Sequence, residues 1–204
     1  MANIVNVDYE AIPRQALSMR THGKELNDEL VTVYQSIQDM HNVWYGERYN
    51  ALLAEFNKIV TNLNELLSLV VDEIPFTLET VANNYSLADR GTNAVQAIRE
   101  EPKKIVALAI PKDVGMKFIT NEVSAIKESV SKNFQNSRNK MDTIETEYNK
   151  IAWQSEAADA FKAKFKKLKN EIVSSFEQLN LQFTNLMNKT MEDIQRTENA
   201  NTVQ

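Results

Sequence analysis

The chain has few of the residues that interrupt helices and none of those that cross-link chains. It contains no cysteine, which excludes a disulfide framework and a thiolate metal site. Glycine and proline number four each in 204 residues, which favours long helices over many strands and turns. The longest apolar run, Ile105 to Ile110, is far shorter than the roughly 20 residues that cross a bilayer. We therefore expect no transmembrane segment.

The sequence also lacks a recognisable signal peptide and the common catalytic, nucleotide-binding and metal-binding motifs. The first ten residues lack a basic stretch followed by an apolar run, so no secretory signal peptide of the usual kind is expected. The two histidines, His22 and His41, belong to no metal-binding pattern of the HExxH or ExxH type. No GxxxxGK[ST], GxGxxG or GxSxG run is present. We expect no catalytic residue, no cofactor and no metal.

The composition is that of an ordinary folded protein with an uneven charge. Hydrophobic residues make up 43% and charged residues 25%, and the net charge is -5. Residues 1–102 carry 7 basic and 15 acidic side chains, whereas residues 103–204 carry 16 and 13. This balance shows no nucleic-acid footprint, so no nucleic acid is expected as a partner.

Hydrophobic residues recur at alternating steps of three and four along four stretches, which is the spacing of one face of a helix. The rows are Leu26, Leu30, Val33, Ile37, Met40 and Trp44; Leu52, Phe56, Ile59, Leu63, Leu66 and Val70; Ile119, Val123, Ile126, Val130, Met141, Ile144, Tyr148 and Ile151; and Phe161, Phe165, Leu168, Ile172, Phe176, Leu179, Phe183 and Leu186. The rows predict helices near 9–42, 47–89, 117–152 and 156–198. The fold class is all-α, with two helix-turn-helix hairpins forming an antiparallel four-helix bundle.

Two residues disturb these predicted helices. Pro75 lies inside the second one and should kink it, because proline lacks the N–H of an intrahelical hydrogen bond. Gly23 lies inside the first one and weakens it by roughly 1 kcal/mol relative to alanine.

The two halves look like a duplication. Trp44-Tyr45-Gly46 lies between the first two predicted helices, and Trp153-Gln154-Ser155 lies between the last two, 109 residues later. At the same offset Phe56 falls on Phe165. The predicted organisation is a first hairpin over residues 1–90, a connector over 91–116 and a second hairpin over 117–204.

Each half resembles the WxG-motif family, the small secreted proteins typified by the early secreted antigenic target of mycobacteria. Trp44 and Gly46 match its turn motif, and Tyr85-Ser86-Leu87-Ala88-Asp89 matches its Tyr-x-x-x-Asp/Glu export signal. Tyr85 and Asp89 would lie one helical turn apart, a pairing that is also common by chance.

The second half departs from the family pattern. Ser155 replaces the glycine of the turn, and no tyrosine follows Trp153, so the second half lacks the export signal. Serine at this place can act as the N-cap of the last helix instead. Trp44 and Trp153 also have a simpler interpretation as large hydrophobes that pack the end of each hairpin.

The resemblance implies a non-enzymatic protein that leaves a Gram-positive cell through a type VII secretion system. It would be cytoplasmic before export and then secreted or at the cell surface, acting by protein–protein interaction as a virulence factor or an export partner. Its partners would be the secretion ATPase and other WxG-like proteins, while its own two hairpins pair with each other. One alternative is a targeting module or escort of a larger LxG-like toxin, and another is an unrelated helical scaffold or bundle enzyme.

The family's dimers pair their hairpins antiparallel, which would bring Tyr85 and Asp89 close to Trp153. The connector is long enough for this arrangement. Its 27 residues from Arg90 to Met116 can extend roughly 89 Å, against roughly 54 Å for a helix of 36 residues. The basic run from Lys162 to Lys169 is expected to be a solvated helix face, with contact to an acidic partner or anionic lipid as the alternative.

Overall fold

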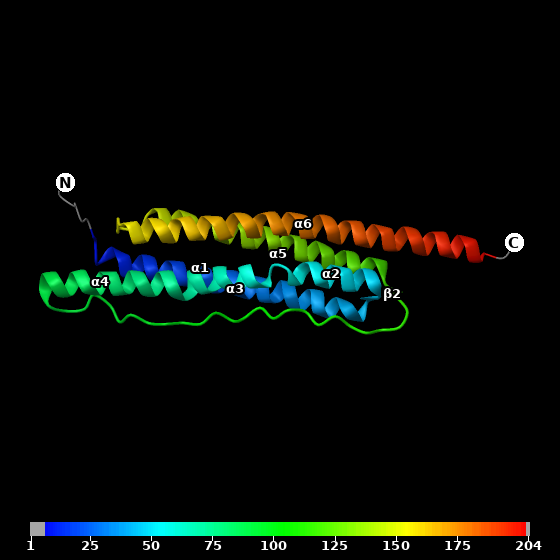
Figure 1. Ribbon diagram of the computed structural model, residues 1–204, viewed down its shortest axis with the longest axis horizontal. Coiled ribbons are helices and arrows are strands. Elements are labelled where there is room, and N and C mark those ends of the chain that lie inside the picture. The colour runs from blue at the N-terminus through cyan, green and yellow to red at the C-terminus, as the bar shows by residue number, and fades with distance from the viewer. Residues whose placement is uncertain (1–6, 203–204) are drawn as a thin grey trace.

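The computed structural model describes residues 7–202 and shows an elongated, mostly helical molecule (Figure 1). Its helices are α1 Ala11–Asp39, the 3-10 helix η1 Met40–Asn42, α2 Glu47–Asn57, α3 Val60–Ser68, the π-helix η2 Leu69–Glu73, α4 Ile74–Arg90, α5 Thr120–Asn149 and α6 Glu156–Asn201. Two short strands, β1 Trp44–Tyr45 and β2 Lys117–Phe118, form a small sheet. The all-α class is confirmed, with this sheet as an addition.

Three of the four predicted helices appear as α1, α5 and α6, with ends within about three residues of the prediction. The second is interrupted. At Lys58 and Ile59 the backbone amides donate to Glu55 and Phe56, three residues back, so α2 ends and α3 begins. A single helix over 47–89 is therefore wrong in detail, although the segment stays helical nearly throughout.

At Pro75, where the sequence predicts a kink, the helix changes its hydrogen-bond pattern. The π-helix η2 directly precedes α4, in which Pro75 is near the N-terminus. Pro75 cannot donate to the carbonyl of Val71, and Arg20 Nε donates to that oxygen at 3.2 Å instead. Gly23 explains the close approach of α1 here, because a Cβ on Gly23 would lie 3.1 Å from Val70 and Val71.

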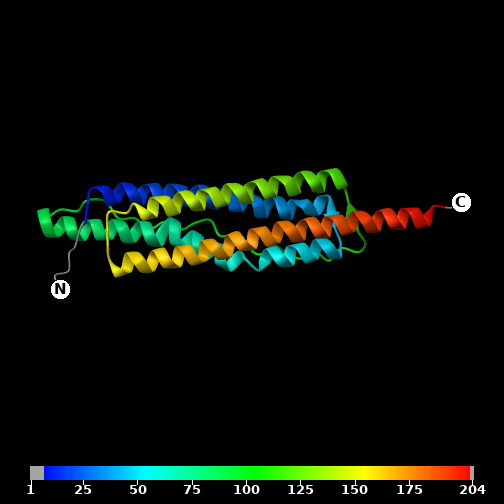
Figure 2. The same cartoon turned by 90° about the horizontal axis from the view of Figure 1, so that it is seen from above.

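The two halves share one hydrophobic core. Helix α1 packs against α4 and α5, while α6 packs against α2, α3 and α5. The helices run side by side along the long axis, and the C-terminal part of α6 projects past the others (Figure 2). Phe56 of the first half stacks on Phe134 of α5, which stacks on Phe176 of α6 at 4.1 Å between ring centroids. Separating the halves would therefore expose aromatic rings.

The connector runs in extended form along the first half, from the end of α4 to β2 (Figure 1). Its backbone is held in turn by Asn83, by Asp72 and finally by Asn50. The connector therefore passes along the first half before α5 begins.

Candidate functional site

The first turn is a closed joint between the two halves. Trp44 of β1 pairs with Phe118 of β2 in antiparallel register, and its side chain is only 1% exposed. Its ring meets Phe118 edge-on at 5.4 Å and stacks on Phe183 of α6 at 6.0 Å. Gly46 has a φ of 123°, a backbone conformation that residues other than glycine rarely adopt. Both motif residues therefore have structural roles here.

The second turn also buries its tryptophan, but it uses a serine N-cap where the first turn uses a glycine. Trp153 is 8% exposed and forms an isolated antiparallel bridge with Val7. Ser155 has an extended backbone, and its side-chain oxygen accepts a hydrogen bond from the Ala158 amide at 3.1 Å. Its interpretation as the N-cap of the last helix is confirmed, and this turn needs no glycine.

The two turns are joined to the molecule in a reciprocal way. The segment that leads into α1 pairs with the turn of the second hairpin, through the Asp8 amide and the Ala152 carbonyl at 3.2 Å. The segment that leads into α5 pairs with the turn of the first hairpin, through the Ile119 amide and the Val43 carbonyl at 2.9 Å. Each hairpin thus holds the lead-in segment of the other, which sequence periodicity does not reveal.

Tyr85 and Asp89 lie near the end of α4, at the same end of the molecule as the second turn. Tyr85 is 37% exposed, and Asp89 accepts a hydrogen bond from the Tyr9 hydroxyl at 2.5 Å. This bond raises the pKa of Tyr9, because the carboxylate favours the protonated phenol. A hollow of about 330 Å³ is lined by Val7, Tyr9, Tyr85, Ala88 and Asp89. Since Val7 also pairs with Trp153, the N-terminal segment bridges the tail and the turn.

A second tie holds the same end. Arg90 lies 3.2 Å from Glu10, and its guanidinium is 5.1 Å from the centre of the Tyr9 ring. The sequence contained no signal for these contacts, because Tyr9 and Glu10 stand outside the hydrophobic rows. The N-terminal segment is therefore a part of this surface that sequence reasoning missed.

The opposite end carries a larger hollow of about 460 Å³ beside the first turn. Its lining includes Gly46, Arg48 and Asp113. Arg48 forms an ion pair with Asp193 of α6, and His41 Nε2 lies 2.6 Å from Asp113. Within residues 7–202 no group of three or more His, Asp or Glu side chains is arranged to hold a metal ion.

Comparison with known proteins gives no relative: no family model, no curated protein and no solved structure matches the chain. Separately, no helix in the described part of the chain has the length and apolar character required to cross a membrane.

Part of the predicted basic face is engaged within the molecule. Lys169 contacts Asp142 at 2.6 Å and pairs with Glu145. Burial opposes the charge of Lys169, but the hydrogen bonds to Asp142 and Glu145 outweigh it and raise its pKa. Lys164 reaches Glu65 of the first hairpin at 3.4 Å. Lysines of this run thus link α6 to α5 and to the first hairpin.

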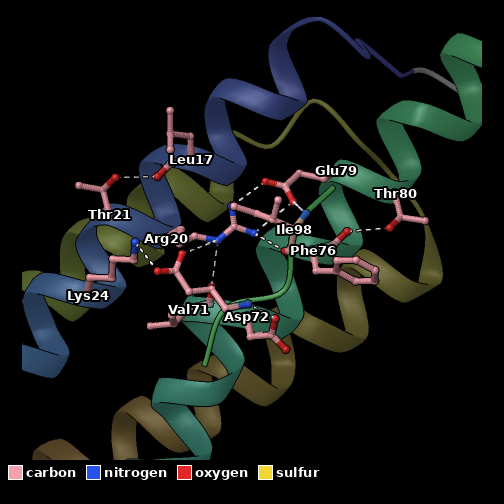
Figure 3. A network of polar contacts seen from close by, with 11 residues as sticks. Leu17, Arg20, Thr21, Lys24, Val71, Asp72, Phe76, Glu79, Thr80 and Ile98 are labelled. Atoms are coloured by element: carbon pink, nitrogen blue, oxygen red, sulfur yellow. Dashed lines mark hydrogen bonds and ion pairs between the residues drawn. The ribbon is translucent and has the colours of Figure 1, made fainter. Parts of the chain in front are cut away.

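A buried polar cluster joins α1, α4 and the connector (Figure 3). Arg20 and Glu79 are 2% and 4% exposed, and the guanidinium pairs with the carboxylate at 2.6 Å. Arg20 also donates to the Ile98 carbonyl at 3.0 Å, while the Ile98 amide donates to Glu79 at 3.0 Å. Every strong acceptor of this cluster is satisfied by a charged or backbone partner, so the pair anchors the connector rather than forming a reactive site.

Proposed function

We propose that the chain is a fused pair of WxG-like hairpins that is exported by a type VII secretion system and acts by protein–protein interaction. The observation that supports this most is the reciprocal pairing of each turn with the lead-in segment of the other hairpin. Val7 meets Trp153 and Phe118 meets Trp44. Such reciprocity is expected of a two-fold dimer whose subunits have become one chain.

The antiparallel four-helix bundle is part of this proposal. It is supported by the shared core and by the connector, which runs the length of the first hairpin before α5 begins. The test uses spin labels on Asp89→Cys and Ser155→Cys, which are clean sites because the chain has no cysteine. The labels should lie within about 20 Å, under four turns of helix.

A second pair of spin labels serves as a control for which a long distance is expected. Labels on Asp89→Cys and Glu47→Cys mark the two ends of one hairpin and should lie about 60 Å apart, at 1.5 Å per helical residue. If the Asp89 and Ser155 labels were also separated by most of the length of a hairpin, the antiparallel arrangement would be rejected.

The export role rests on Tyr85 and Asp89, which resemble the family signal and are exposed at the end of α4. The test replaces both with alanine in a producing strain and compares culture supernatant with lysate, with and without the secretion ATPase. The double variant should stay in the cells, because it lacks the proposed signal. Its helicity should be unchanged, because neither side chain belongs to the core.

A control for surface change is available on α6. Glu177 and Leu181 are also an exposed acidic and apolar pair one turn apart. Replacing both with alanine should leave export unchanged. Normal supernatant levels of the Tyr85 and Asp89 variant, or equal loss for the control, would contradict the proposed signal.

A further inference from the structure

Three asparagines each make two hydrogen bonds to the backbone of a single connector residue. Asn57 donates to the Leu108 carbonyl at 2.9 Å and accepts from the Leu108 amide at 2.6 Å. Asn64 does the same with Ile105, at 2.9 Å for both bonds. Asn27 of α1 clamps Lys103 through bonds of 2.8 and 2.7 Å. Each amide thus engages one residue as a neighbouring β-strand would, without reading its side chain.

The helix and the connector keep a common register. Asn57 ends α2 and Asn64 lies in α3, seven residues later. A continuous helix of that length would rise roughly 10.5 Å, and the two asparagines hold connector residues three apart. Three residues of polyproline II span roughly 9.3 Å, so the two repeats nearly match. The connector's inward residues follow the same period of three: Pro102, Ile105, Leu108 and Pro111 are buried or half-buried, and the residues between them are exposed.

The register extends one step further to Asn50, seven residues before Asn57. Asn50 donates to the carbonyl of Pro111, three residues after Leu108, at 3.3 Å. Its Oδ1 atom is buried and accepts no hydrogen bond from the described residues. This oxygen has no donor because the connector residue at this position is Pro111, which has no backbone N–H. The connector therefore fits this row of asparagines with one hydrogen bond missing.

Charge adds a second element of recognition. Residues 1–90 carry 6 basic and 13 acidic side chains. Two of the acidic ones bind basic connector residues that precede Ile105: Asp28 contacts Lys103 at 2.8 Å, and Asp72 contacts Arg99 at 2.7 Å. A basic extended segment suits this face better than an acidic one.

We propose that Asn50, Asn57 and Asn64 form a peptide-binding track on the first hairpin, which the connector fills in cis. The track accepts an extended segment of another polypeptide that is apolar at every third residue, carries basic residues before the one held by Asn64, and is able to offer a backbone N–H to Asn50. Such a segment forms every bond that the connector forms and one more. The site lies along the flank of the first hairpin, apart from the end that carries Tyr85 and Asp89.

The experiment uses the full chain with a weakened connector, Ile105→Asp and Leu108→Asp. The probe is a fluorescent peptide with the sequence of residues 99–113, and its binding is followed by anisotropy. It should bind this variant saturably and bind the native chain on the order of tenfold or more weakly, because the tethered connector competes at about millimolar effective concentration. Replacing Asn57 and Asn64 with alanine in the weakened chain should abolish binding.

The missing hydrogen bond supplies the sharpest test. A peptide carrying alanine in place of Pro111 should bind about fivefold more tightly, the effect of one neutral hydrogen bond. This gain should vanish when Asn50→Ala is added to the weakened chain. A gain that persists without Asn50 would come from the peptide's own flexibility and would overturn the register.

Three further outcomes contradict the proposal. One is no saturable binding by a weakened chain that keeps native helicity, and another is equal binding of a peptide with Asp at its Ile105 and Leu108 positions. The third is a dimer of the weakened chain that the peptide does not dissociate, which would mean that the track serves exchange between copies. If the Asp variant loses helicity, Ile105→Ala with Leu108→Ala gives the same comparison.

Discussion

The two turns, at residues 44–46 and 153–155, each join two helical segments and contain a buried tryptophan, yet their backbones are built differently. The first uses Gly46 with a φ of 123° and seals its tryptophan to 1% exposure. The second uses Ser155 as an N-cap with an ordinary extended backbone and leaves its tryptophan at 8%. The glycine of the motif is thus a local backbone requirement, while the tryptophan serves packing at both turns.

The partners of the two tryptophans differ as well. Trp44 meets the aromatic rings of Phe118 and Phe183 from the second half of the chain. Trp153 instead forms a backbone bridge with Val7 of the N-terminal segment, and the side chain of Val7 is aliphatic. The first turn should therefore contribute more to the cohesion of the two hairpins than the second.

Truncating the tryptophans tests this comparison with the largest expected effect. Trp44→Ala should lower the free energy of unfolding by about 3–5 kcal/mol, the usual cost for a buried aromatic side chain. Trp153→Ala should cost less, because its side chain is less enclosed. Denaturant titration measures both. Equal losses would remove the distinction between the turns, and losses below about 0.5 kcal/mol would make both tryptophans surface residues.

Exchanging the third residue of each motif sharpens the comparison. Gly46→Ser should cost about 1–3 kcal/mol, because serine would be forced into a backbone conformation typical of glycine. Ser155→Gly should cost only a few tenths of a kcal/mol, since glycine is itself tolerated at an N-cap. Thermal and denaturant unfolding of both variants give the values. A harmless Gly46→Ser would show that the motif glycine is not required by the turn.

Sequence reasoning succeeded where a feature repeats along the chain. The rows of apolar residues predicted the helices, and the recurrence of Trp44 at Trp153 predicted two turns with partly buried tryptophans, which are in fact buried. The interpretation of Ser155 as a cap followed from its place before a helical row. These features depend on local spacing, which a single sequence displays.

It failed where a feature depends on contacts between distant residues. The strands β1 and β2 have two residues each, too few for an alternating pattern. Arg20 and Glu79 are 59 residues apart, and nothing local marks them as a pair. Asn50 and Asn57 do show a seven-residue spacing, but polar residues on a helix normally face solvent. The connector that covers them could be recognised only in three dimensions.

Buried tyrosines near the two turns should make the protein sensitive to alkali. Burial raises the pKa of Tyr49 to about 12, and it also raises the pKa of Tyr148. A raised pKa in the folded state means that stability is intact below about pH 10, the unfolded value, and falls above it. The loss should be about 1.4 kcal/mol per pH unit for each tyrosine until its folded pKa is passed.

Denaturant unfolding at a series of pH values measures this loss, and absorbance titration shows where the phenolates form. Tyr49→Phe should reduce the slope of the unfolding free energy against pH, between pH 10 and 12, by the contribution of one proton. Tyr148→Phe should reduce it by the same amount at the other turn. If the chain unfolded equally steeply with either buried tyrosine replaced, their protonation would not be the cause.

The smallest expected effect belongs to the bond between Tyr9 and Asp89. Removing the hydroxyl with Tyr9→Phe should lower the free energy of unfolding only slightly, because the bond is exposed and water can replace either partner. The ring stays beside Arg90, so the cation–π contact is retained. Asp89→Asn should cost about as little, and the double variant should cost less than the sum of the two, since both remove one bond. Strict additivity in this cycle would show that Tyr9 and Asp89 are neighbours without being coupled, and that the N-terminal segment is held at this end by its other contacts.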